Sequence, residues 1–172
     1  MSGSQDGDAG GIQCDNDFWR FSLAVYSDRD VADECLALQQ AAGVDVNLLL
    51  FCAWAGAGAV VLSRTDIEAA SKRVAGWQEH VVRPLRSARQ SMKASGYADF
   101  ESFRTRVKSM EIEAEQVEQA MLFAFSQGLK DSDLSPRNVI AGNIKNYFEA
   151  LRGPEGLKLS APRLIETALR AR

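Results

Sequence analysis

The chain has 172 residues, of which 46% are hydrophobic and 25% are charged, so it suits one globular domain and is not a disordered chain. Its formal net charge of −3 is too small to indicate a partner by itself. Three widely spaced cysteines and a single histidine exclude most zinc sites, so we expect reduced thiols, a cytoplasmic protein and no metal or other cofactor.

The first residues and the longest apolar run bear on targeting. Residues 1–14 are predicted to form a disordered tail, because 1–11 are rich in glycine, serine and aspartate and lack the basic and apolar regions of a signal peptide. The longest apolar run, residues 48–62, is shorter than the roughly 20 residues that a membrane span needs. It therefore predicts a buried helix and no membrane span.

The N-terminal third of the sequence predicts three helices. The first starts at Asp15 or Asn16, either of which can cap it, and it has one apolar face. The second ends at Gly43, because glycine favours the left-handed conformation that closes a helix. The third, capped by Asp45, spans 46–55 and is apolar on every side, so we expect it at the centre of the fold.

Two long helices should follow and form an antiparallel hairpin. Thr65 and Glu68 match a capping box at the start of the first helix, and Pro84 predicts a kink or break. Gly96 marks the turn. In the second helix apolar residues recur as a heptad seam: Phe100, Phe103, Val107, Met110, Ala114, Val117, Met121 and Ala124. An intermolecular coiled coil is the alternative to packing within the hairpin.

The C-terminal part of the chain predicts two further helices. One follows Ser135 and Pro136, a cap with proline at the first helical position, and a short one begins near Pro162. We therefore predict an all-α, single-domain helical bundle of about six to eight helices. Residues 15–128 would form its core, and residues 129–172 would be a C-terminal helical extension packing on that core.

Several motifs recur in order in a known group of proteins. They are 17–21 (DFWRF), 35–39 (CLALQ), 43–51 (GVDVNLLLF), Trp77, 81–86 (VVRPLR), and Val107 and Lys108 with Glu111 and Glu115. On these motifs the chain resembles a proteobacterial family of small, all-helical proteins of unknown function, over about residues 17–122. The resemblance implies a small, soluble bacterial domain and assigns no activity, and the region after Gly128 lies outside the family pattern.

The most informative charge pattern lies in the predicted hairpin. Residues 83–108 carry seven cations and two carboxylates, a local net charge of +5, whereas the rest of the chain carries −8. Both arms would bring their cations to one end, where an anionic ligand or an acidic protein would neutralise them. A solvated helical face is the alternative, and nucleic acid is disfavoured because the chain is acidic overall. The candidate residues are Arg83, Arg86, Arg89, Lys93, Arg104, Arg106 and Lys108.

Carboxylates crowd the second hairpin helix. Glu111, Glu115 and Glu118 share one helical face, and carboxylates placed in this way can supply ligands to a metal ion in a helical bundle. Carboxylate metal sites in bundles also use histidines from paired helices, and the chain has only one. We therefore favour ion pairs across the hairpin, namely Arg83 with Glu111, and Arg73 or Lys72 with Glu118.

A pocket between helices is a second candidate site. Its residues would be Trp19, Asn47, Trp54 and Trp77. We predict no catalytic residue, because Cys52 is predicted to be a buried, inert thiol and His80 a structural or surface group.

These patterns favour a non-enzymatic binding or adaptor protein whose basic hairpin end meets an anionic or acidic partner. One alternative is an enzyme or small-molecule carrier with a pocket near the tryptophans. A second is a structural homo-oligomer held through the heptad seam.

Overall fold

The computed structural model describes residues 13–94, 100–129 and 131–171, and within these ranges the chain is helical without a strand. The helices are α1 (Asp17–Tyr26), α2 (Arg29–Ala42), α3 (Val46–Ala57), α4 (Arg64–Trp77), α5 (Arg83–Ala94), α6 (Glu101–Ser126), α7 (Pro136–Arg152) and α8 (Pro162–Arg170). A π-helical turn, Gln78–Val82, joins α4 to α5, and a 3₁₀ turn, Gly153–Lys158, follows α7. The all-α prediction is confirmed.

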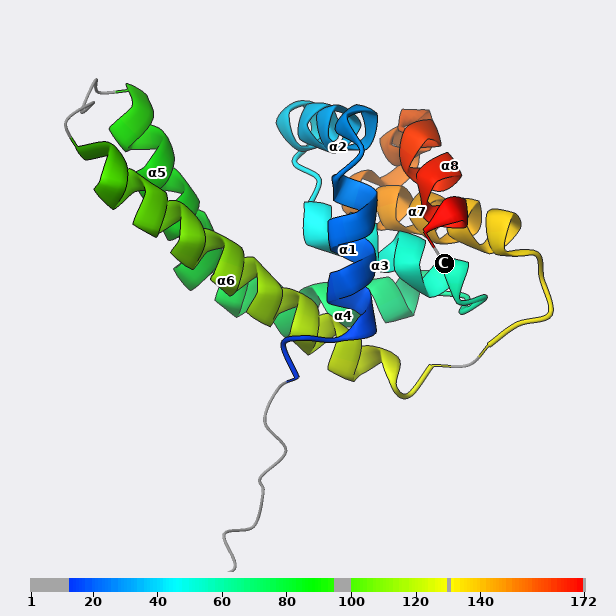
Figure 1. Cartoon of the computed structure of the whole chain (residues 1–172). Helices are drawn as coiled ribbons and strands as arrows, with labels where there is room; N and C mark the ends of the chain where they lie inside the picture. Colours follow the sequence, from blue (N-terminus) through cyan, green and yellow to red (C-terminus); the bar gives the residue numbers. More distant parts are fainter. Residues whose placement is uncertain (1–12, 95–99, 130, 172) are drawn as a thin grey trace, which may run out of the picture.

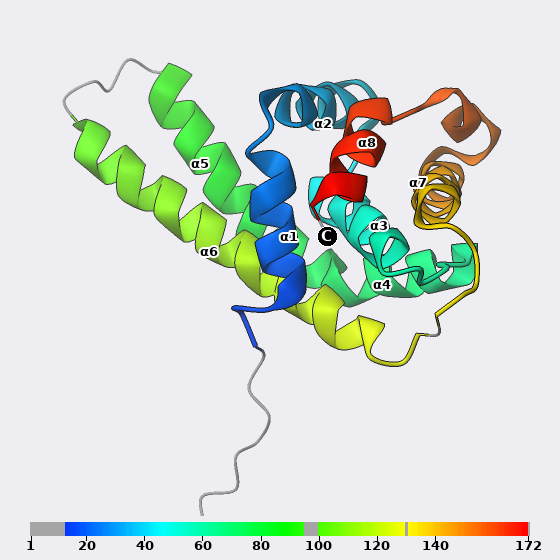
Figure 2. The same cartoon turned by 45° about the vertical axis from the view of Figure 1, so that its right-hand side comes forward.

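The helices form a body and one projecting arm. α1, α2, α3, α4, α7 and α8 gather around a common centre, whereas α5 and the first half of α6 extend away from it side by side (Figures 1 and 2). We call α5 together with residues 101–115 the arm. The antiparallel hairpin is thus present, but its predicted turn at Gly96 lies outside the described residues.

The centre of the body is α3, as its composition predicts. Nearly all of its residues are buried, because an apolar surface on every side gains most when helices cover it on all sides. α7 approaches it most closely: a Cβ atom added at Gly56 would lie 2.6 Å from the backbone of Ile140. Asn143 on α7 also accepts a hydrogen bond from the Leu62 amide at 2.8 Å and donates to the Val60 carbonyl at 2.9 Å.

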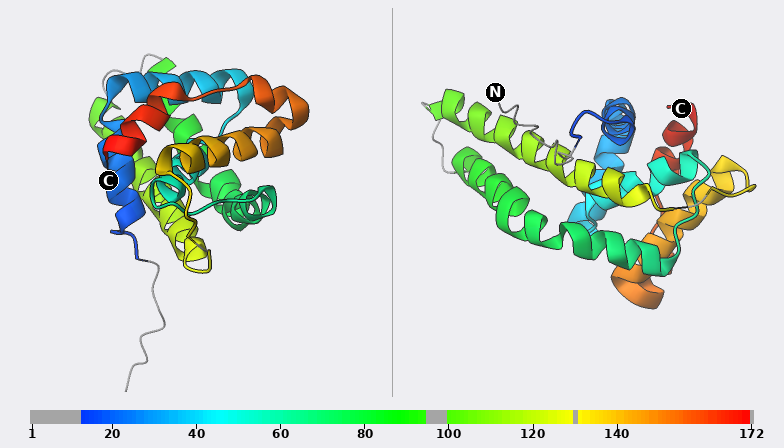
Figure 3. Two further views of the ribbon diagram at one scale, coloured as in Figure 1. Left: turned by 90° about the vertical axis from the view of Figure 1, so that its right-hand side faces the viewer. Right: turned by 90° about the horizontal axis from the view of Figure 1, so that it is seen from below.

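The two C-terminal helices share this core. Phe148 of α7 and Leu164 of α8 are fully buried in it, and α7 packs on α3 and α4 whereas α8 packs on α1, α2 and α3 (Figure 3). Glu34 on α2 caps α8, since its carboxylate accepts hydrogen bonds from the amides of Arg163 at 3.1 Å and Leu164 at 2.9 Å. The hydrophobic core therefore includes residues from both predicted parts of the chain, 15–128 and 129–172.

One local prediction, the capping box, named the wrong residues, and of the kink or break predicted at Pro84 the break does not occur. α4 begins with a capping box on Ser63 and Asp66, not on Thr65 and Glu68. Pro84 causes no break, because the π turn precedes it and the helix runs on into α5. Proline in a helix lacks a donor and crowds the preceding turn, and the wider π turn accommodates both effects.

The heptad seam of α6 is only partly used. Val107 and Ala114 are buried, but Phe103 and Met110 remain 47% and 54% exposed. Because the arm projects from the body, no second layer of helices covers this side of it (Figure 1). None of the described helices is long and apolar enough to cross a membrane.

Candidate functional site

Two arginines fasten α5 to α6. Arg86 donates to Glu111 at 3.1 Å and to Glu115, and Arg89 donates to both carboxylate oxygens of Glu111. Burial opposes ionisation of Glu111, but the hydrogen bonds from Arg89 and Arg86 hold its pKa below the ordinary value. We call these four residues the arginine clamp, and it makes the arm a braced pair of helices.

The clamp replaces the ion pairs that the sequence predicted. Arg83 does not reach Glu111; it donates to Glu79 on the preceding turn at 2.8 Å. Glu118 forms no salt bridge with Arg73 or Lys72 among the described residues. For each pair that does form, the point midway between its two residues in the sequence lies after Gly96. The registry of the two helices therefore differs from the one expected.

The seven predicted cations therefore do not form one basic end. Arg86 and Arg89 are held in the clamp, and Arg83 lies at the base of the arm. Nearer the free end, Arg104 pairs with Glu101, which lies three residues before it. The structure records no salt bridge for the other three, within the ranges that it describes: Lys93, Arg106 and Lys108.

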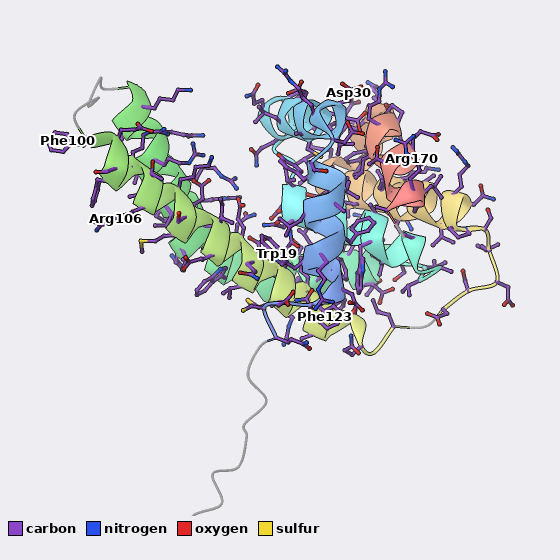
Figure 4. All side chains as sticks on the ribbon, viewed as in Figure 1. Trp19, Asp30, Phe100, Arg106, Phe123 and Arg170 are labelled. Atoms are coloured by element: carbon purple, nitrogen blue, oxygen red, sulfur yellow. The ribbon has the colours of Figure 1, made fainter. Side chains whose placement is uncertain are left out.

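One edge of α6 exposes an apolar and cationic stripe. Phe103, Arg106 and Met110 recur at spacings of three and four residues and therefore share a side of the helix. The Arg106 guanidinium lies over the Phe103 ring, 5.5 Å from its centroid. Figure 4 shows Arg106 on the arm, well away from Trp19, which lies where α1 meets α6. We call these three residues the arm stripe.

A pair of carboxyl groups, one fully buried and one half-buried, lies where the arm joins the body. Glu118 is fully buried and neither of its carboxyl oxygens makes a hydrogen bond of ordinary geometry. Burial and the neighbouring charge of Asp45 raise its pKa to about 9, so it carries a proton at neutral pH. The half-buried Asp45 caps α3 and accepts from the side chain of Gln78, and burial raises its pKa too. We call Asp45 and Glu118 the acid pair.

A cavity of about 400 Å³ opens between α1, α3 and α6, with Arg89 of α5 at one end. We call it the groove. Its wall is mainly apolar, and its floor contains Asn47, which accepts a hydrogen bond from Gln119 at 2.9 Å. The lining residues include Trp19, Ser22, Leu23, Tyr26, Val46, Asn47, Leu50, Lys108, Ile112, Glu115 and Gln119.

The four residues of the predicted pocket do not come together. Trp19 and Asn47 both line the groove. Trp54 stacks instead among phenylalanines, 5.3 Å from the Phe18 ring, and lines a separate cavity near the end of α3. Trp77 donates to the Ala114 carbonyl at 2.8 Å and so fastens α4 to α6.

Most residues of the groove were not predicted from the sequence. On α6, residues 108, 112, 115 and 119 are spaced as one helical stripe, and that spacing was a usable signal. Leu23 and Tyr26 were harder to find, because they flank the buried face of α1 and resemble ordinary surface residues.

The titratable groups outside these clusters give no reactive constellation in the described ranges. Burial raises the pKa of the Cys35 thiol to about 12 and that of Cys52 still further, so both stay protonated and unreactive. His80 is exposed on the π turn. No group of three His, Cys, Asp or Glu side chains within the described part of the chain could hold a metal ion.

Comparison with known proteins gives one finding. Residues 17–122, which run from the start of α1 into the last turns of α6, match a family described as "Protein of unknown function (DUF2390)". No curated protein and no solved structure matches the chain.

Proposed function

The chain belongs to this family of unknown function, and we propose that it is a non-enzymatic binding or adaptor protein whose arm docks on an acidic, amphipathic segment of another protein. The observation that carries the proposal is the arm stripe, which presents apolar side chains beside a cation on a braced, projecting pair of helices.

The arm is built to present a surface. No residue of α5 is fully buried, so the arm adds little to the core of the body. It keeps its shape through the arginine clamp, whose Glu111 is almost fully buried between the two helices. A surface that is ordered before binding loses less conformational entropy when a partner docks, which favours affinity.

The composition of the arm stripe sets the chemistry of the partner. Phe103 and Met110 offer flexible and aromatic apolar surface, which protein interfaces use preferentially. Arg106, with Lys93 on the same arm, makes the surroundings cationic. An amphipathic helix with carboxylates along one edge matches both features. Nucleic acid matches less well, because carboxylates already neutralise Arg86, Arg89 and Arg104.

The test uses a synthetic amphipathic peptide with leucine at helical spacing and glutamate at its edges. Its binding to the full chain is measured by fluorescence anisotropy at two salt concentrations. The substitutions Phe103→Ser and Arg106→Glu together should weaken binding by about tenfold or more, and salt should weaken binding to the unmodified chain. A matched control, Leu36→Ser with Arg29→Glu on the exposed side of α2, should bind normally.

Two outcomes would overturn the proposal. One is a peptide affinity that neither the stripe substitutions nor exchange of glutamate for lysine in the peptide changes. The other is a concentration-dependent dimer in sedimentation that the stripe substitutions abolish, since a second copy of the chain would then be the occupant of the stripe.

A further inference from the structure

We infer that the groove between α1, α3 and α6 is a second binding site, which takes a small amphipathic carboxylate with an apolar body and an amide or hydroxyl donor near its head. The site is independent of the arm stripe.

The wall of the groove fits the apolar body of such a ligand. Three large apolar side chains that remain more than 40% exposed, Leu23, Tyr26 and Ile112, converge on this one cavity from α1 and α6. Trp19 and Leu50 continue the apolar surface. A contiguous apolar hollow of about 400 Å³ lies in the size range of small-molecule sites.

The charged end of the groove selects an anion. Arg89 and Glu111 line this end but neutralise each other within the arginine clamp, and Glu115 is engaged by Arg86. Lys108 also lines the groove and has no recorded salt bridge within the described ranges. The charge left for a ligand is therefore that of the Lys108 ammonium group, and a carboxylate head complements it.

The floor of the groove has hydrogen-bonding capacity that the protein does not use. The Ser22 hydroxyl and the Oε1 atom of Gln119 are buried without a hydrogen-bond partner, and these residues are only 3% and 2% exposed. Unpaired buried polar atoms are unfavourable, so a ligand group that pairs with them gains affinity. Oε1 only accepts hydrogen bonds.

The groove and the arm stripe lie on opposite edges of α6. Lys108 and Ile112 are separated around the helix by well over a quarter-turn from Phe103 and Arg106, because successive residues advance by about 100°. Substitutions in one site therefore leave the other surface intact, and the two proposals can fail separately.

Isothermal titration calorimetry of the full chain with N-decanoylglycine tests the inference. Ile112→Gln should weaken binding about tenfold, and Lys108→Gln about threefold or more, since the first removes apolar wall and the second the cation. Both residues are exposed, so the variants should fold. The matched controls, Leu36→Gln and Lys93→Gln, and the arm-stripe double variant should bind like the unmodified chain.

Comparison of probes checks the chemistry of the head. Decanoate, which has no donor, should bind more weakly than N-decanoylglycine, and decyltrimethylammonium should bind at least about tenfold more weakly. Absence of binding by N-decanoylglycine, equal binding of the cationic probe, or affinities unchanged by both groove substitutions would overturn the inference.

Discussion

Replacing Glu118 by glutamine should make the protein more stable at neutral pH, although the side chain is fully buried. Folding raises the pKa of Glu118 from its ordinary 4.5 to about 9, so the folded state holds a proton that the unfolded state releases. The contribution of Glu118 to the stability of the folded state is therefore most favourable below about pH 4.5 and declines as the pH rises to about 9. Each pH unit in this window lowers the free energy of unfolding by up to roughly 1.4 kcal/mol. Between pH 4.5 and pH 7 the loss approaches about 3 kcal/mol.

Glutamine has nearly the same shape and stays neutral at every pH. The Glu118→Gln variant should thus gain about 2–3 kcal/mol at pH 7 and lose most of this pH dependence. Urea unfolding followed by circular dichroism, repeated from pH 5 to pH 9, measures both effects. Glu113→Gln, an exposed site on the same helix, is the control and should change neither. A Glu118→Gln variant that is less stable at pH 7 and keeps the original pH slope would refute the reasoning.

Three further perturbations address the clamp, the core and a cap. Glu111→Gln should cost about 2 kcal/mol at pH 7, measured by urea unfolding, because two arginines lose their charged partner. Since folding lowers the pKa of Glu111, the difference from the unmodified chain should shrink as the pH falls below about 4; a constant difference would contradict this. Gly56→Ala should cost about 1–3 kcal/mol in thermal unfolding by pressing on Ile140, whereas Gly76→Ala in α4, where the space is open, should be neutral or stabilising. Glu34→Ala should cost about 1 kcal/mol and speed amide hydrogen exchange at the start of α8; unchanged exchange there would count against the cap.

Much of the fold follows from the sequence because its signals are local. Asn16 and Asp45 cap the helices that they were expected to cap, and Gly43 closes α2 in the left-handed conformation. The central position of α3 follows from its composition alone, since a helix without a polar side must be covered all round. These inferences need only neighbouring residues or one helix at a time.

The candidate sites depend on the registry between helices, which local patterns do not set. The π turn before Arg83 adds a residue to the helical turn and changes which side chains of α5 face α6. Arg86 and Arg89 consequently reach Glu111, which had been assigned to Arg83. The groove draws its residues from four helices, so no single periodic stretch of sequence outlines it.

The close packing of α7 against α3 has a practical consequence for work on the family. A fragment that stopped at residue 122 would contain every matched position and yet strip one whole side from α3. It would remove Phe125, whose ring packs against Phe51, uncover the side of α3 that contacts α7, and leave the Leu62 amide without Asn143. Such a fragment should aggregate or unfold, so recombinant versions of this protein need to keep the C-terminal residues through the end of α8.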